Sequence, residues 1–112
     1  MKAYGLAYKC QRPATNTDKF YLVTYVPAHE SGPRLVKCYG RRGTPGRLDP
    51  VPFALTRQAE EALGSVIDTR AAHQYDWIVG PVEFTSRPGL SDRAIVDEFV
   101  AAAGGPIAVG MR

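Results

Sequence analysis

The sequence has 112 residues, of which 45% are apolar and 22% charged, so we expect one folded domain and exclude an intrinsically disordered chain. No apolar run approaches the roughly 20 residues of a membrane-spanning helix, and no signal-peptide stretch follows the first residues, which predicts a cytoplasmic protein without a membrane partner. The net charge is +3, but residues 34–57 alone carry +5, from six Lys/Arg against Asp49, which favours an anionic partner for the middle of the chain.

Two strands are predicted in the first quarter of the chain. Large apolar residues alternate with small or polar ones over residues 4–10, which is typical of a half-buried strand. Residues 11–18 contain proline and asparagine and are expected to form a loop. Residues 19–26 are aromatic and β-branched on both faces, which suits a central strand.

A hairpin is predicted next in the chain. Residues 34–42 alternate in character and form its first strand. Pro45 and Gly46 suit the two central positions of a turn. A short strand at residues 47–48 would close the hairpin before the two following prolines end its pairing.

Two helices are predicted in the second half. Apolar residues recur at helical spacing over residues 57–71, with Thr56 as the expected N-cap, and over residues 92–103, with Ser91 as the cap. Two short strands are expected between the helices, on either side of Gly80-Pro81, and the segment after the second helix is expected to be loosely held.

These elements predict an α+β fold within one domain, residues 1–112. It should hold an antiparallel sheet of about four to five strands, with an amphipathic helix packed on one face and a C-terminal helix in addition.

No catalytic or metal-binding pattern is present. The two cysteines, Cys10 and Cys38, and the two histidines are isolated from one another and give no metal-ligand spacing, so we expect no metal and no cofactor. Cys38 alternates with apolar positions and is expected to be a buried free thiol. No nucleophile motif is recognisable, so we expect no catalytic residues and no enzymatic activity.

The most distinctive surface is expected on the hairpin. Lys37, Tyr39 and Arg41 share one face of the third strand, where cations suit phosphates and an aromatic ring can stack on a sugar or base. Arg42 and Arg47 flank the turn. Three alternatives stay open: a solvated hairpin, a surface for an acidic protein partner, and a hairpin masked by the acidic C-terminal third. The candidate nucleic-acid-binding residues are Lys37, Tyr39, Gly40, Arg41, Arg42 and Arg47.

The hairpin sequence resembles the WGR domain family, named for a Trp-Gly-Arg strand motif. The matching stretch is Tyr39-Gly40-Arg41, and three further segments agree in order: Asn16 with Lys19-Phe20-Tyr21, Phe53 with Ala59-Glu60-Glu61-Ala62, and His73-Gln74-Tyr75. The similarity covers about residues 4–77, and the chain resembles a stand-alone bacterial protein of this family. Residues 78–112 do not match the family.

The resemblance implies a DNA-binding module acting at strand ends or nicks, as in the WGR domains of poly(ADP-ribose) polymerases. Tyr39 would then pack on a terminal sugar, and Arg41 would contact the DNA backbone. Two residues depart from the motif: Tyr39 replaces the tryptophan, and Arg42 replaces an aliphatic residue that would point inward. No polymerase domain is present, so ADP-ribosyl transfer is not implied.

Overall fold

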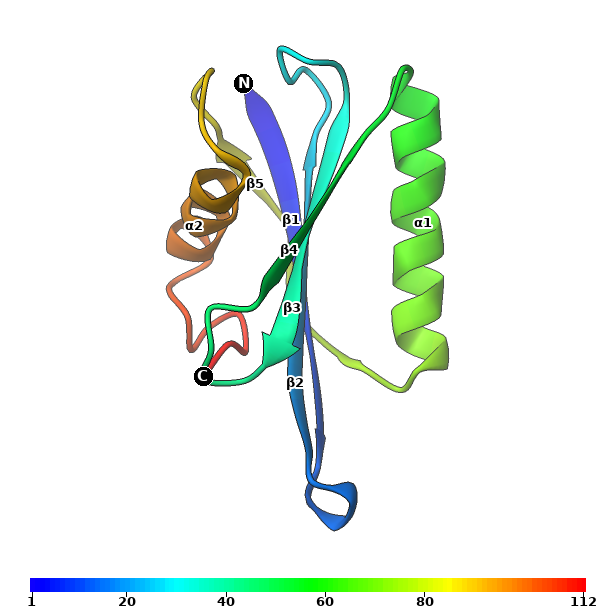
Figure 1. Cartoon of the computed structure of the whole chain (residues 1–112), viewed down its shortest axis with the longest axis vertical. Helices are drawn as coiled ribbons and strands as arrows, with labels where there is room; N and C mark the ends of the chain where they lie inside the picture. Colours follow the sequence, from blue (N-terminus) through cyan, green and yellow to red (C-terminus); the bar gives the residue numbers. More distant parts are fainter.

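The computed structural model describes residues 1–112 and shows a five-stranded antiparallel sheet with one helix against each face (Figure 1). The strand order is β4-β3-β2-β1-β5, so the last strand pairs with the first. This confirms the predicted α+β fold. The elements are β1 (Lys2–Arg12), β2 (Thr17–Val26), β3 (Arg34–Arg41), β4 (Arg47–Pro52), α1 (Thr56–Ala72), β5 (Asp76–Thr85) and α2 (Asp92–Ala102).

Side-chain alternation along the central strand divides the interior into two cores. Tyr21, Val23 and Tyr25 of β2 point to the face covered by α1. Phe20 and Leu22 point to the opposite face, which is covered by α2 and the C-terminal segment. Residues 20–26 are therefore buried on both sides, as predicted for a central strand.

The first strand differs from the half-buried strand that its sequence predicts. Gly5 and Ala7 point to the α2 face and are buried there, because small residues allow a helix to approach the sheet closely. The strand is also longer than predicted and continues to Arg12. Only a 3-10 turn, Pro13–Thr15, lies between the first two strands, and this hairpin projects beyond both helices (Figure 1).

The β3–β4 turn and β4 also differ from the prediction. The Thr44 N–H donates to the Arg41 carbonyl at 3.2 Å, and Gly43 adopts a φ of 91°, so the hydrogen-bonded turn precedes Pro45-Gly46. The prolines at positions 50 and 52 do not end the pairing and stay in register with β3. An edge strand tolerates proline because one of its sides needs no backbone partner.

The helix starts are close to those predicted. The Ser91 hydroxyl accepts a hydrogen bond from the Ala94 N–H at 3.1 Å and caps α2, as expected. Thr56 is the first residue of α1 rather than its cap, because Leu55 holds the N-cap position. The Leu55 N–H donates to the Gln58 side-chain oxygen at 3.1 Å, which is the half of a capping box that the N3 residue supplies.

Two predictions for the C-terminal third were wrong. The two short strands form a single strand, β5, which continues through Gly80-Pro81 with a shift in register against β1. The segment after α2 is docked rather than loose, since Val109 is fully buried. The Gly43 N–H donates to the Met111 carbonyl at 2.6 Å, and the chain end lies beside the β3–β4 turn (Figure 1).

Both cysteines are buried free thiols, which confirms the predicted burial of Cys38. Burial raises the pKa of the Cys38 thiol, and the neighbouring Arg93 opposes that shift. His, Cys, Asp and Glu side chains do not gather in groups of three that could hold a metal ion. None of the helices combines the length and apolarity required to cross a bilayer.

Candidate nucleic-acid interface

Lys37, Tyr39, Arg41 and Arg47 of the predicted hairpin lie on the α1 side of the sheet. Strand register aligns a row of side chains across all five strands on this side, starting with Arg47 on β4 and Tyr39 on β3. The row continues through Tyr21 on β2 and Tyr8 on β1 and ends with Trp77 on β5. Because directly paired residues share a face, the row forms an aromatic band with a cation at one end.

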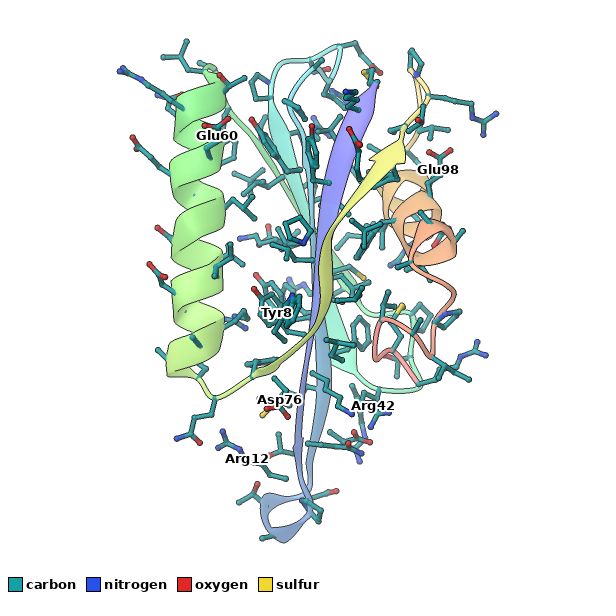
Figure 2. All side chains as sticks on the ribbon, turned by 180° about the vertical axis from the view of Figure 1, so that it is seen from behind. Tyr8, Arg12, Arg42, Glu60, Asp76 and Glu98 are labelled. Atoms are coloured by element: carbon teal, nitrogen blue, oxygen red, sulfur yellow. The ribbon has the colours of Figure 1, made fainter.

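Three cations cluster next to this row, beyond the end of α1. Lys19 is the register partner of Arg41, so both point to the same face. Arg12 follows on β1, and Figure 2 shows it on the α1 side below the helix. Lys19 and Arg41 are exposed, as is Arg47 in the row described above. None of these three cations, nor Arg12, forms an ion pair with a carboxylate. We define the basic face as Arg12, Lys19, Tyr39, Arg41, Arg47 and Trp77.

Tyr39 presents only part of its ring to solvent. It stacks on Tyr21 with ring centroids 5.4 Å apart and planes 10° apart. The guanidinium carbon of Arg70 lies 4.1 Å from the Tyr21 centroid and 4.8 Å from that of Tyr75. One face of the Tyr39 ring is therefore covered by the Tyr21 ring, and the residue as a whole stays half-buried.

Lys37 points to the same side of the sheet but has an internal partner. Its Nζ lies 3.1 Å from the Asp49 carboxylate, and its side chain is 22% exposed. The pair is aligned by register, because Lys37 and Asp49 are direct cross-strand neighbours. Lys37 therefore contributes less free charge to the surface than Arg41 or Arg47.

Arg42 lies on the opposite side of the sheet from the other predicted cations (Figure 2). It follows the last residue of β3, so alternation turns its side chain towards the α2 face. Its Nε donates to the Gly110 carbonyl at 3.0 Å and its Nη1 to Asp18 at 3.1 Å. The charged replacement of an inward aliphatic residue is thus accommodated by an ion pair and by the docked C-terminus.

Two of the three hairpin glycines are required by packing within the protein rather than by the approach of a binding partner. A Cβ on Gly40 would lie 3.2 Å from the Cα of Gly46, and one on Gly46 would meet the Phe20 ring at 2.5 Å. Only Gly43 faces open space. The close approach expected of a foreign backbone is therefore possible at Gly43, whereas Gly40 lets the turn fold back against β3.

Helix α2 does not cover the basic face. The helix α2 packs on the other side of the sheet, against Phe84 and the α2-facing residues of β2 and β3. Figure 1 shows the two helices separated by the sheet. Masking by α2 therefore does not occur, while the chain end contacts the hairpin at Arg42 and Gly43.

Three residues of the basic face were missed in the sequence: Arg12, Lys19 and Trp77. Lys19 and Arg12 are placed in the cluster by strand register, which cannot be read from the sequence alone. Trp77 carried a usable signal, because it is the one tryptophan of the chain and begins an edge strand. Its side chain is 61% exposed, although tryptophan is usually well buried.

Comparison with known proteins gives one family and one similar fold. Residues 4–79 match the sequence profile of the WGR domain. A crystal structure of a protein from Bacteroides fragilis is similar, with a TM-score of 0.58 and 20% sequence identity, over 67% of this chain and 19% of that chain. At that identity it supports the fold alone, and this chain spans about a fifth of the other protein. No curated protein matches.

Proposed function

The chain belongs to the WGR domain family, whose members are generally nucleic-acid-binding modules, and on this premise we propose that it binds DNA through the basic face. The observation that carries the proposal is the cluster of Lys19, Arg41 and Arg47, three exposed cations on one face without ion-pair partners. Unpaired cations can replace the counterions condensed on DNA phosphates, which drives association.

The aromatic residues of the basic face favour strand ends and nicks. A closed duplex presents phosphates along its length but hides the flat surfaces of its bases and sugars. An end or nick uncovers such surfaces, on which Tyr39 or the exposed Trp77 can stack. We therefore assign phosphate contacts to the cations and end preference to the aromatic rings.

The role of this face is binding rather than catalysis. Its charged groups are guanidinium and ammonium ions, which position phosphates.

Replacing Arg41 with alanine tests the phosphate contacts. For three or four neutralised phosphates, log K should fall with log salt concentration with a slope of about −3 for the unmodified chain. Arg41→Ala should reduce that slope by about one and weaken all DNA sequences alike, because a phosphate contact carries no base information. The measurement is fluorescence anisotropy with nicked, blunt-ended, circular and single-stranded DNA at several salt concentrations.

A matched control removes an arginine from elsewhere on the surface. Arg87 is exposed in the loop between β5 and α2, far from the basic face, and Arg87→Ala should leave the slope unchanged. Equal effects of Arg41→Ala and Arg87→Ala would mean that only net charge matters. Absence of binding to every DNA form at low salt would overturn the proposal and favour an acidic protein partner.

Replacing Tyr39 with alanine tests the preference for ends. Loss of one stacking contact should weaken binding to nicked and blunt DNA by about 1–3 kcal/mol and leave the salt slope unchanged. Binding to closed circular DNA should change much less. Tyr4→Ala is the control, because Tyr4 also lies on the α1 face beside a second tyrosine, Tyr25, but at the far end of β1. Equal weakening of nicked and circular DNA would remove the end preference while leaving general binding intact.

A further inference from the structure

A pocket of about 420 Å³ lies between α1 and strands β3 and β4. Small-molecule sites have volumes of this order and combine apolar walls with a few polar groups. The pocket follows the direction of the helix, and its polarity changes along its length. The end near the start of α1 is apolar, and the end near the last turn of the helix is polar. The apolar end is lined by Leu35, Val51, Phe53 and Ala62, and the polar end by Tyr21, Lys37, Thr69 and Arg70.

The polar end contains a guanidinium with unmet hydrogen-bonding capacity. Arg70 lies over the rings of Tyr21 and Tyr75, and its buried Nε has no acceptor. The two Nη groups are not buried in this way and make no hydrogen bond, so they are the donors that a ligand in the pocket can reach. Arg70 has no carboxylate partner, whereas Arg34, Lys37 and Arg42 each form an ion pair.

A second cation reaches the same end of the pocket from the sheet. Lys37 projects from β3 and pairs with Asp49 at 3.1 Å, so the two cations face a single carboxylate and one positive charge is left over. Tyr21 also lines this end, and burial raises the pKa of Tyr21 to about 12, which keeps its hydroxyl protonated. The polar end is therefore suited to one anionic group.

We propose that this pocket binds a small organic monoanion, with its anionic head between Lys37 and Arg70 and its apolar body against Leu35 and Phe53. The division of the pocket into an apolar and a cationic end matches a ligand of this kind. A fully polar anion would leave the apolar walls unfilled, and a neutral apolar ligand would leave the Arg70 charge without a counter-ion. This site is separate from the DNA contacts of Arg41 and Arg47 and stands without them.

The charge of the head and the place of binding can be tested together by NMR. The probes are 2-naphthoate and its uncharged analogue 2-naphthylmethanol, each titrated into the isotopically labelled full chain. Naphthoate should shift backbone amides of β3 and of α1 from residue 62 to residue 70, and it should bind roughly tenfold more tightly than the alcohol. Shifts confined to the α2 side, or equal affinities of the two probes, would overturn the proposal.

Paired arginine variants then test the assigned head group. Arg70→Met keeps an apolar stem but removes the guanidinium, and it should lower naphthoate affinity roughly tenfold without changing that of the alcohol. Arg57→Met makes the same change in the first turn of α1, outside the pocket, and should have no effect. Equal affinities in the two variants would exclude the role of Arg70.

A second variant tests the pocket if Arg70→Met should prove unstable. Ser65 lines the pocket from an exposed position of α1, so Ser65→Phe fills the space without removing a core side chain. It should abolish the shifts caused by both probes while thermal unfolding stays cooperative. Retained binding of naphthoate in a folded Ser65→Phe variant would contradict the pocket as its site.

Discussion

Gly5→Val is expected to remove a large part of the stability of this domain. A Cβ at Gly5 would coincide with the ring of Phe99, which is fully buried in the core beneath α2. The larger side chain must displace the ring or lift the helix from the sheet. Loss of a buried phenylalanine contact typically costs about 3–5 kcal/mol, against a total stability of about 5–15 kcal/mol for a small domain. Urea unfolding followed by circular dichroism measures the change.

A glycine in α1 gives a control for which the expected change in stability has the opposite sign. Gly64 lies within α1, and a Cβ there would meet no atom within 4 Å, so Gly64→Ala should stabilise the domain by about 0.5–1 kcal/mol. The attribution to Phe99 is tested by adding Phe99→Leu to Gly5→Val, which should recover part of the loss. Simple additivity of the two changes would show that the clash lies elsewhere.

The sequence predicted those features that depend on local pattern. The helical repeat of α1 and the alternation in β3 follow from residue spacing alone, so the shared face of Lys37, Tyr39 and Arg41 could be inferred before the structure. The Ser91 cap likewise depends on residues three positions apart. Such signals survive folding because neighbours in sequence remain neighbours in space.

Features that depend on contacts between distant segments could not be predicted. The alternation in β1 favoured a solvent-exposed face at Gly5 and Ala7. The helix that covers this face lies about ninety residues further along the chain, and no residue of β1 indicates its presence. The Gly110 carbonyl that accepts from Arg42 comes from the docked C-terminus, which lies far from Arg42 in sequence. Trp77 joins the basic face only through its register with Tyr8. Each of these required the topology as well as the sequence.

Helix α2 lies in the C-terminal segment that the family match does not cover, and it supports the β3–β4 hairpin from the opposite side of the sheet. Arg93 of α2 donates to the Pro45 carbonyl at 2.9 Å and to the Gly46 carbonyl at 3.0 Å. The same guanidinium lies 3.5 Å from the Cys38 sulfur. These contacts fix the turn whose two strands carry Arg41 and Arg47, so α2 can order the basic face without touching DNA.

Arg93→Ala is therefore expected to lower both the stability of the domain and its affinity for DNA. Hydrogen bonds from a charged donor contribute about 1.5–3 kcal/mol, and this loss should appear in urea unfolding. Ordering a freed loop on binding costs about 0.5–1.5 kcal/mol per immobilised side chain, so affinity should fall roughly three- to tenfold.

The salt slope separates this indirect role from a direct one. It should stay constant in Arg93→Ala, because no phosphate contact is removed, while the amides of Gly43 and Thr44 should exchange faster with solvent. Arg93→Lys should resemble the alanine variant, since an ammonium lacks the planar fork that spans two adjacent carbonyls. A salt slope reduced by one would place Arg93 in direct contact with DNA. Unchanged DNA affinity together with faster amide exchange would show that DNA binding does not require an ordered turn.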